Sequence, residues 1–153
     1  MNSTLRLFRK LSKFPLGSAI FSKGVTLRAP YFASIHPLVV DLRPGTCEVR
    51  IKDRRSIRNH FGSVHAGAMC NLSELVGGLA VDVSLPSRLR WIPKEMNVRY
   101  LKKAKGTLTG ICSFDPAVLV PGDISLPLEI RDEAGNAVLQ ATIIFYISER
   151  PGN

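Results

Sequence analysis

The sequence contains no long hydrophobic run, because charged side chains interrupt every apolar stretch before the roughly 20 residues that a membrane-spanning helix needs. Its three cysteines are widely spaced, and no Cys-x-x-Cys or Cys/His spacing indicates a metal site. Internal repeats and linker-like segments are also missing. These absences predict one domain of 153 residues with no metal or redox cofactor and with reduced thiols, as in the cytoplasm.

Acidic residues are missing from the first 30 residues, which carry six of the cations behind the net charge of +9 and leave about +3 for the rest. No nucleic-acid motif accompanies this charge, so we expect no nucleic-acid partner. Because apolar residues lie among the cations, residues 1–27 are either a solvated helical cap or a peripheral contact with anionic lipid or phosphate. Lysine and arginine interrupt each apolar stretch before residue 30, which argues against a secretory signal, whereas a mitochondrial presequence stays open.

Hydrophobic periodicity predicts an α+β domain. Helical patterns cover residues 3–14 and 16–27, and a longer apolar helix covers 66–83. Two-residue alternation, punctuated by Pro and Gly turns, predicts the strands. Two precede the long helix and four follow it, at 39–42, 47–51, 92–100, 108–114, 124–131 and 139–147. We therefore expect an N-terminal helical extension over residues 1–30 and, over residues 31–150, an antiparallel sheet laid against one helix.

The most informative segment runs from Asn59 to Glu74, where a polar, glycine-containing turn leads into the apolar helix. Glu74 is the only acidic residue between Asp53 and Asp82. An ionised group among apolar neighbours is costly unless it is paired or useful. A turn of small residues also leaves backbone N–H groups free at the helix start, where they can hold a developing negative charge. The segment therefore predicts a catalytic or binding site.

The pattern Asn59-x-x-Gly62-x-x-His65-x-Gly67, with an acid nine residues after the histidine, resembles the hotdog-fold acyl-CoA thioesterases of the phenylacetyl-CoA thioesterase-like branch. Residues 97–106 and 128–141 resemble the later strands of that family, so the likeness covers roughly residues 35–148. The N-terminal helices and Ala66, which replaces the first glycine of the usual His-Gly-Gly, resemble the branch named domain of unknown function 4442. The resemblance implies a curved sheet wrapped around helix 66–83.

The resemblance also implies roles in thioester hydrolysis. Glu74 acts as a general base or as a nucleophile that forms an anhydride, and the Gly67 N–H stabilises the oxyanion. Asn59 orients the water or the carbonyl and meets Glu74 across a homodimer interface, within a dimer or a dimer of dimers. Two structural alternatives stay open: an ion pair between Glu74 and Arg99, and a turn-capping role for Asn59. His65 is expected to position the loop rather than to transfer protons.

The substrate that the resemblance implies is a thioester of coenzyme A or of acyl carrier protein, and coenzyme A enters only as part of that substrate. We expect His60, Ala66 and Ala68 to contact the substrate beside the motif. Arg99, Lys102 and Lys103 follow the central helix on a strand and turn, and they are candidates for binding its phosphates. An ordinary solvated strand end is the alternative for these cations.

Two further functions remain open. His60 and Glu74, fourteen residues apart, resemble the His/Glu pair of the hydroxyacyl-thioester dehydratases of the same fold, although the prolines that those enzymes carry between the two residues are missing. The basic N-terminus and Ala66 also suit a non-catalytic, acyl-binding or membrane-associated module.

Overall fold

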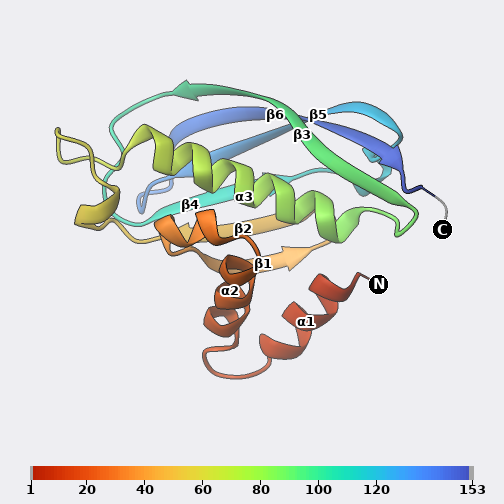
Figure 1. Ribbon diagram of the computed structural model, residues 1–153. Coiled ribbons are helices and arrows are strands. Elements are labelled where there is room, and N and C mark those ends of the chain that lie inside the picture. Colours follow the sequence, from red (N-terminus) through yellow and green to blue (C-terminus); the bar gives the residue numbers. More distant parts are fainter. Residues whose placement is uncertain (1, 152–153) are drawn as a thin grey trace.

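One long helix, α3 (Ala66–Ser84), lies along a six-stranded antiparallel sheet that curves around it (Figure 1). The computed structural model describes residues 2–151 and confirms the predicted α+β architecture. The strands lie in the spatial order β1-β2-β4-β5-β6-β3. Their bounds are β1 (Leu38–Arg43), β2 (Thr46–Ile51), β3 (Leu89–Tyr100), β4 (Leu108–Ser113), β5 (Gly122–Arg131) and β6 (Ala137–Glu149). Strands β1 and β3 therefore form the two edges of the sheet.

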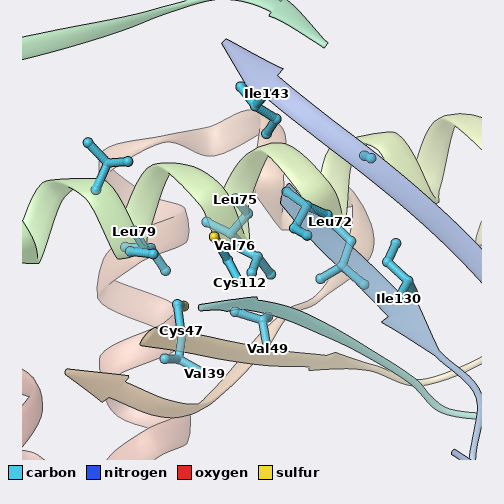
Figure 2. Packing of buried hydrophobic residues seen from close by; sticks show 14 of the residues in the cluster. Val39, Cys47, Val49, Leu72, Leu75, Val76, Leu79, Cys112, Ile130 and Ile143 are labelled. Carbon is cyan, nitrogen blue, oxygen red and sulfur yellow. The ribbon is translucent and has the colours of Figure 1, made fainter. Parts of the chain in front are cut away.

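The core lies between α3 and the inner face of the sheet (Figure 2). Alternation in the strands supplies one layer, as in β2, where Cys47, Val49 and Ile51 are buried. Helix α3 supplies the other layer through side chains such as Leu72 and Val76. The helix approaches the sheet closely at Gly110, since a Cβ atom there would lie 2.8 Å from Cγ2 of Val76. A glycine in the middle of β4 thus sets the distance between helix and sheet.

A bulge in β3 reverses the alternation that the sequence suggested for this strand. The register against β6 shifts between Pro93 and Glu95. Before the bulge, Trp91 packs against the core while Ile92 is exposed; after it, Met96 packs inward. Regular alternation along the predicted strand at 92–100 would place Ile92 and Met96 on one face, but the extra residue of the bulge moves each following side chain to the opposite face.

The N-terminal residues form two helices, α1 (Ser3–Leu11) and α2 (Gly17–Arg28), which project from the body as a hairpin (Figure 1). Helix α1 ends before the predicted residue 14, because Pro15 disfavours helical geometry at Phe14. The rings of Phe8 and Phe21 join the two helices edge to face, 5.0 Å apart. Three short 3-10 helices complete the fold: η1 (Pro30–Ile35), η2 (Arg55–Ile57) and η3 (Pro116–Val118). None of the described helices is long and apolar enough to cross a membrane.

Two sets of polar contacts attach the hairpin to the body. At the start of α1, Asn2 Nδ2 donates to the backbone oxygen of Asp82 at 2.8 Å, and Thr4 Oγ1 donates to the Asp82 carboxylate at 3.1 Å. In α2, the buried hydroxyl of Ser22 accepts the backbone N–H of Val39 in β1 at 2.8 Å. The hairpin is therefore held by α3 on one side and by the edge of the sheet on the other.

Candidate functional site

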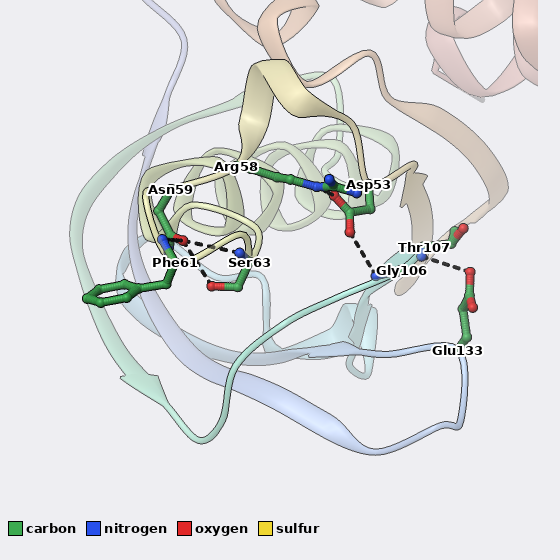
Figure 3. Close-up of polar contacts among 8 residues, drawn as sticks. All are labelled: Asp53, Arg58, Asn59, Phe61, Ser63, Gly106, Thr107 and Glu133. Carbon is green, nitrogen blue, oxygen red and sulfur yellow. Dashed lines mark hydrogen bonds and ion pairs between the residues drawn. The ribbon is translucent and has the colours of Figure 1, made fainter.

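The loop that leads into α3 is held by the carboxylate of Asp53 (Figure 3). Asp53 Oδ1 accepts Nε–H of Arg58 at 2.7 Å, and Oδ2 accepts the backbone N–H of Gly106 at 3.1 Å. The hydrogen bond from Arg58 is the main reason that the pKa of Asp53 lies below its ordinary value of 3.8. One carboxylate thus joins the loop before α3 to the turn before β4.

The side chain of Asn59 organises the tip of this loop. Its Oδ1 accepts hydrogen bonds from the backbone N–H groups of Phe61 and Ser63, at 3.0 and 3.2 Å, and from the Ser63 hydroxyl at 3.1 Å (Figure 3). This is the turn-capping role that the sequence left open for Asn59. The Nδ2 group has no partner among residues 2–151, so it remains available as a donor to a bound molecule.

His65 caps the N-terminus of α3. Its Nδ1 accepts the backbone N–H of Gly67 at 2.9 Å, and His65 has extended φ and ψ of −64° and 139°. The N–H groups of Ala68 and Met69 bond to the His65 carbonyl oxygen. The donor that the sequence analysis assigned to the oxyanion, Gly67 N–H, is therefore occupied. Among the described residues the Ala66 N–H has no acceptor, which makes it the free donor at this helix end.

Glu74 lies on the outward side of α3 and is exposed in the single chain. Its apolar neighbours in sequence, such as Leu72 and Leu75, point into the core instead. No ion pair or hydrogen bond joins Glu74 to another described residue, and the pair with Arg99 that the sequence left open does not form. An isolated carboxylate therefore stands on this surface with no structural partner.

A groove of about 420 Å³ opens beside Glu74, between α3, β3 and the α2–η1 segment. Arg28 and Asp82 are its other charged residues. Its lining is otherwise mainly apolar and includes Val25, Ala29, Phe32, Leu75, Leu79 and Trp91. A narrow apolar groove with few charged groups is typical of a small-molecule site. None of the groove residues other than Glu74 had been singled out from the sequence, because they come from α2, η1, α3 and β3, far apart in the chain.

A second, smaller hollow of about 260 Å³ lies at the N-terminus of α3. It brings together four residues that the sequence proposed for the site: Asn59, Ala66, Lys102 and Lys103. Tyr100 also lines it, although the sequence analysis identified that residue only as the end of the strand at 92–100. Its hydroxyl lies 3.2 Å from Sγ of Cys70, and this hydrogen bond, with partial burial, raises the pKa of Tyr100 to about 12. Tyr100 is therefore a neutral phenol at the edge of this hollow.

Three further predicted site residues, Arg99, Ala68 and His60, line neither hollow. Arg99 pairs with Gln140 on the outer face of the sheet, where it lines a separate depression of about 500 Å³. Ala68 packs against the core, and the exposed ring of His60 stacks on Phe61 with centroids 3.9 Å apart. Lys102 lies 3.5 Å from the Asp132 carboxylate, and Lys103 Nζ lies 5.8 Å from the Phe61 ring centroid.

Within one chain the carboxylate beside the first hollow and the free donor at the second lie far apart. Glu74 follows Ala66 by eight residues on the same helix, a separation of about 12 Å at 1.5 Å per residue. A carboxylate and an oxyanion donor that serve the same carbonyl must both lie within about 3 Å of the reacting atoms. The two hollows therefore lie along one side of α3, one with the isolated carboxylate of Glu74 and the other with the free N–H of Ala66.

The family model described as "Domain of unknown function (DUF4442)" matches residues 17–147. The chain belongs to this family. The match begins in α2 and ends in β6, so it includes Glu74 and the loop that leads into α3. No curated protein sequence matches this chain significantly.

Solved structures agree with the family assignment. The crystal structure of the genomics target APC5556 is 36% identical, with a TM-score of 0.86 over 96% of this chain and 99% of that one. PA5026 from Pseudomonas aeruginosa, described as a protein of unknown function and probable thioesterase, is 25% identical, with a TM-score of 0.77 over 90% and 97%. Thioesterase HI1161 from Haemophilus influenzae is 16% identical, with a TM-score of 0.70 over 78% and 82%, and shares the fold. The hotdog fold predicted from the motif is confirmed.

Proposed function

We propose that this protein hydrolyses an acyl thioester of coenzyme A or of acyl carrier protein to a carboxylic acid and a thiol. The observation that carries the proposal is the isolated carboxylate of Glu74 at an apolar groove. No contact within the described chain explains this carboxylate. The description of PA5026 as a probable thioesterase supports the same chemistry.

Thioester hydrolysis requires a nucleophile, stabilisation of the carbonyl oxygen and departure of a thiolate. Glu74 either removes a proton from the attacking water or attacks the carbonyl itself to form an anhydride that water then opens. The Ala66 N–H donates to the oxyanion, and Gly67 N–H joins it only when the His65 ring turns away. Asn59 Nδ2 orients the water or the carbonyl. The thiol is acidic enough for its thiolate to leave without help from a strong general acid.

The proposal requires a homodimer, because Glu74 and the Ala66 N–H are too far apart within one chain. A two-fold axis that sets two α3 helices antiparallel places Glu74 of one protomer beside Ala66 of the other and forms two complete sites. Strand β3 offers a surface for this pairing. Beyond the bulge, residues 96–100 form a regular stretch whose outer edge has no neighbouring strand, and Tyr100 lies against α3 at Cys70.

In such a dimer the two hollows become parts of one substrate site. The groove beside Glu74 takes the acyl chain against Phe32, Leu79 and Trp91. The hollow at the start of α3 takes the thiol side, where Lys102 and Lys103 lie close enough to attract its phosphates. Arg99, on the outer face of the sheet, takes no part in this arrangement.

The decisive experiment measures thiol release from acetyl-, octanoyl-, palmitoyl- and phenylacetyl-CoA by wild-type protein and by Glu74→Gln. Loss of the carboxylate should lower kcat at least a hundredfold, as expected for a general base or nucleophile. Glu95→Gln is the matched control, because Glu95 is an exposed carboxylate that also lines the surface beside Glu74. Since the protein's own three thiols react with common detection reagents, each variant is compared with a substrate-free reaction.

Equal turnover by wild type and Glu74→Gln would overturn the assignment of Glu74. Absence of thiol release from every substrate, by protein shown to be folded and dimeric, would overturn the hydrolase proposal and favour an acyl-binding module.

A further inference from the structure

The hairpin of α1 and α2 exposes an unusual number of large apolar side chains. Phe14 is 62% exposed, Leu16 79%, Leu27 70% and Tyr31 77%. On α2, the side chains of Ile20 and Leu27 are seven residues apart and so form one stripe along the helix, and Tyr31 follows in η1. A Cβ atom added at Gly24, within this stripe, would meet nothing within 4 Å. An apolar hollow of about 480 Å³ between α1 and α2, lined by Leu7 and Ile20, continues the surface.

This exposure does not come from a loosely attached segment. Phe8 and Phe21 are buried between the helices, Ser22 bonds to β1, and the start of α1 bonds to Asp82. The hairpin therefore buries one apolar side and holds a second one away from the body, with its turn far from the sheet (Figure 1). A contiguous exposed apolar surface on a soluble domain indicates a contact with another molecule or with a membrane.

Leu16 adds a second, independent observation. Its backbone has φ of 63°, in the left-handed region that favours glycine or asparagine. A leucine is therefore strained at this position, and its exposed side chain gains no burial that would offset the strain. Conformations of this kind are retained where the side chain has another use. The most exposed of these apolar residues thus stands at the very turn of the hairpin.

The positive charge of the hairpin indicates which kind of molecule covers its exposed apolar surface. No acidic residue precedes Asp41, and Lys10, Lys13 and Lys23 are exposed on the hairpin. A second copy of the hairpin would bring these cations against like charges. An anionic lipid surface attracts the cations and receives the apolar side chains at the same time, as an amphipathic helix does in the interfacial plane.

We propose that the α1–α2 hairpin docks the protein on anionic membranes, with Phe14, Leu16, Ile20 and Leu27 in the interface and the lysines at the headgroups. Val25 of α2 lines both the hollow between α1 and α2 and the groove beside Glu74. Docking therefore places that groove next to the lipid. The proposal rests on the exposed apolar side chains of the hairpin, the left-handed backbone of Leu16 and the exposed lysines, and it does not depend on thioester hydrolysis.

The test is co-sedimentation of the full-length protein with vesicles of phosphatidylcholine and phosphatidylserine, and with phosphatidylcholine alone. We expect binding to the mixed vesicles that weakens as salt is raised. The double variant Lys13→Gln/Lys23→Gln should bind on the order of 25-fold more weakly, at about fivefold for each charge. Its control, Arg50→Gln/Lys52→Gln, removes the same charge from β2 and the residue after it and should bind as wild type does.

The apolar part of the surface is tested by Phe14→Ser/Leu16→Asn. Asparagine suits the left-handed backbone at position 16, so this variant should keep or raise the melting temperature while it loses vesicle binding. Val120→Ser, at an exposed apolar residue outside the hairpin, is the control. Wild-type protein that stays in solution with mixed vesicles, or hairpin variants that bind like their controls, would overturn the proposal. So would loss of the wild-type oligomer in Phe14→Ser/Leu16→Asn, because a second copy would then cover this surface.

Discussion

His65 and Gly67 are joined by a hydrogen bond of 2.9 Å from the backbone N–H of the glycine to the imidazole Nδ1. This bond requires a ring with an unprotonated Nδ1, and it makes the imidazole the cap of the central helix. It also divides the backbone donors at the helix start into an occupied one, at Gly67, and a free one, at Ala66. The first two predictions follow from that division.

Replacing His65 separates a capping role from proton transfer. His65→Ala should destabilise the protein by about 1 kcal/mol, because a helix N-cap is lost. His65→Asn should be close to wild type in stability and should keep most thiol-release activity, because asparagine is a good N-cap. Thermal unfolding and kcat report the two effects. If His65→Asn is stable but has lost nearly all of its kcat, proton transfer would be assigned to the imidazole.

Ala66→Pro should remove the free donor without breaking the helix. Ala66 is the first residue of α3, where proline is favoured, and His65 already has the extended backbone that a following proline demands. We expect a melting temperature near that of wild type and a kcat lower by about a hundredfold to a thousandfold, the usual effect of losing an oxyanion donor. Unchanged turnover in the folded variant would return the role to Gly67.

Cys70 should report the arrangement of the proposed dimer. It lies midway between Ala66 and Glu74 on the same side of α3, so a two-fold axis that brings Glu74 to the partner's Ala66 also brings the two Cys70 thiols together. Oxidation with diamide should yield a covalent dimer on non-reducing gels, through loss of the two thiol protons and two electrons to the reagent. Cys70→Ser should abolish it. Cys47→Ser and Cys112→Ser should not, because burial raises the pKa of both thiols and shields them.

Asp53 predicts an acid limit for the loop before α3. Its pKa is lower in the folded protein than its ordinary value of 3.8, mainly through the hydrogen bond from Arg58. The stabilisation of the folded protein by the Asp53 carboxylate is therefore fully present above pH 3.8 and is lost as the pH falls through the pKa of Asp53 in the folded protein. Asp53→Asn should lower the free energy of unfolding by about 1 kcal/mol at pH 7, and the difference from wild type should shrink in acid. Denaturant unfolding at several pH values measures it; a difference that persists below the folded pKa would contradict the assignment.

His60 discriminates between hydrolase and dehydratase chemistry. Its ring is exposed and stacks on Phe61, an arrangement that suits a loop side chain with no part in proton transfer. His60→Ala should therefore keep most of the thiol-release activity. A dehydratase would lose nearly all hydration of an enoyl-CoA in the same variant, so both reactions are measured on one protein preparation.

The sequence predicted the parts of the fold that depend on periodicity. The alternation from Leu139 to Ile147 gave β6, and the apolar run from Ala66 gave α3. The prediction from sequence failed where a single residue alters the face on which side chains lie or the expected position of a strand in the sheet. Because of the bulge at Lys94, Trp91 packs against the core and Ile92 is exposed. Pro127 cannot donate a ladder hydrogen bond, which favours an edge strand or a bulge, yet β5 lies between β4 and β6. The proline is tolerated because the registered pairing of β5 with β4 ends at Leu128.

The site was predicted less completely, because its geometry depends on contacts between distant segments. The sequence identified Glu74 but placed it among apolar neighbours, whereas a helix can turn one residue outward while those beside it stay buried. Arg99 and Lys102 are close in sequence, yet Arg99 belongs to the outer face of the sheet. The capping rule could have identified the Ala66 donor, since an N-cap side chain accepts from the second or third helical residue and leaves the first one free.

Helix α2 carries apolar residues on two sides that face different surroundings. One side seals the groove beside Glu74, and the other is turned away from the body with its apolar stripe bare. Because both sides of α2 carry apolar residues, these residues are spread around the helix rather than gathered on one side. An amphipathic pattern in the sequence therefore does not reveal the two contacts of this helix. It also means that deleting residues 1–27 would remove Thr4 and Val25 from the wall of the groove beside Glu74 together with the proposed membrane contact. Single exposed positions such as Leu16, which line no part of that groove, therefore allow the proposed membrane contact to be altered while the groove is left intact.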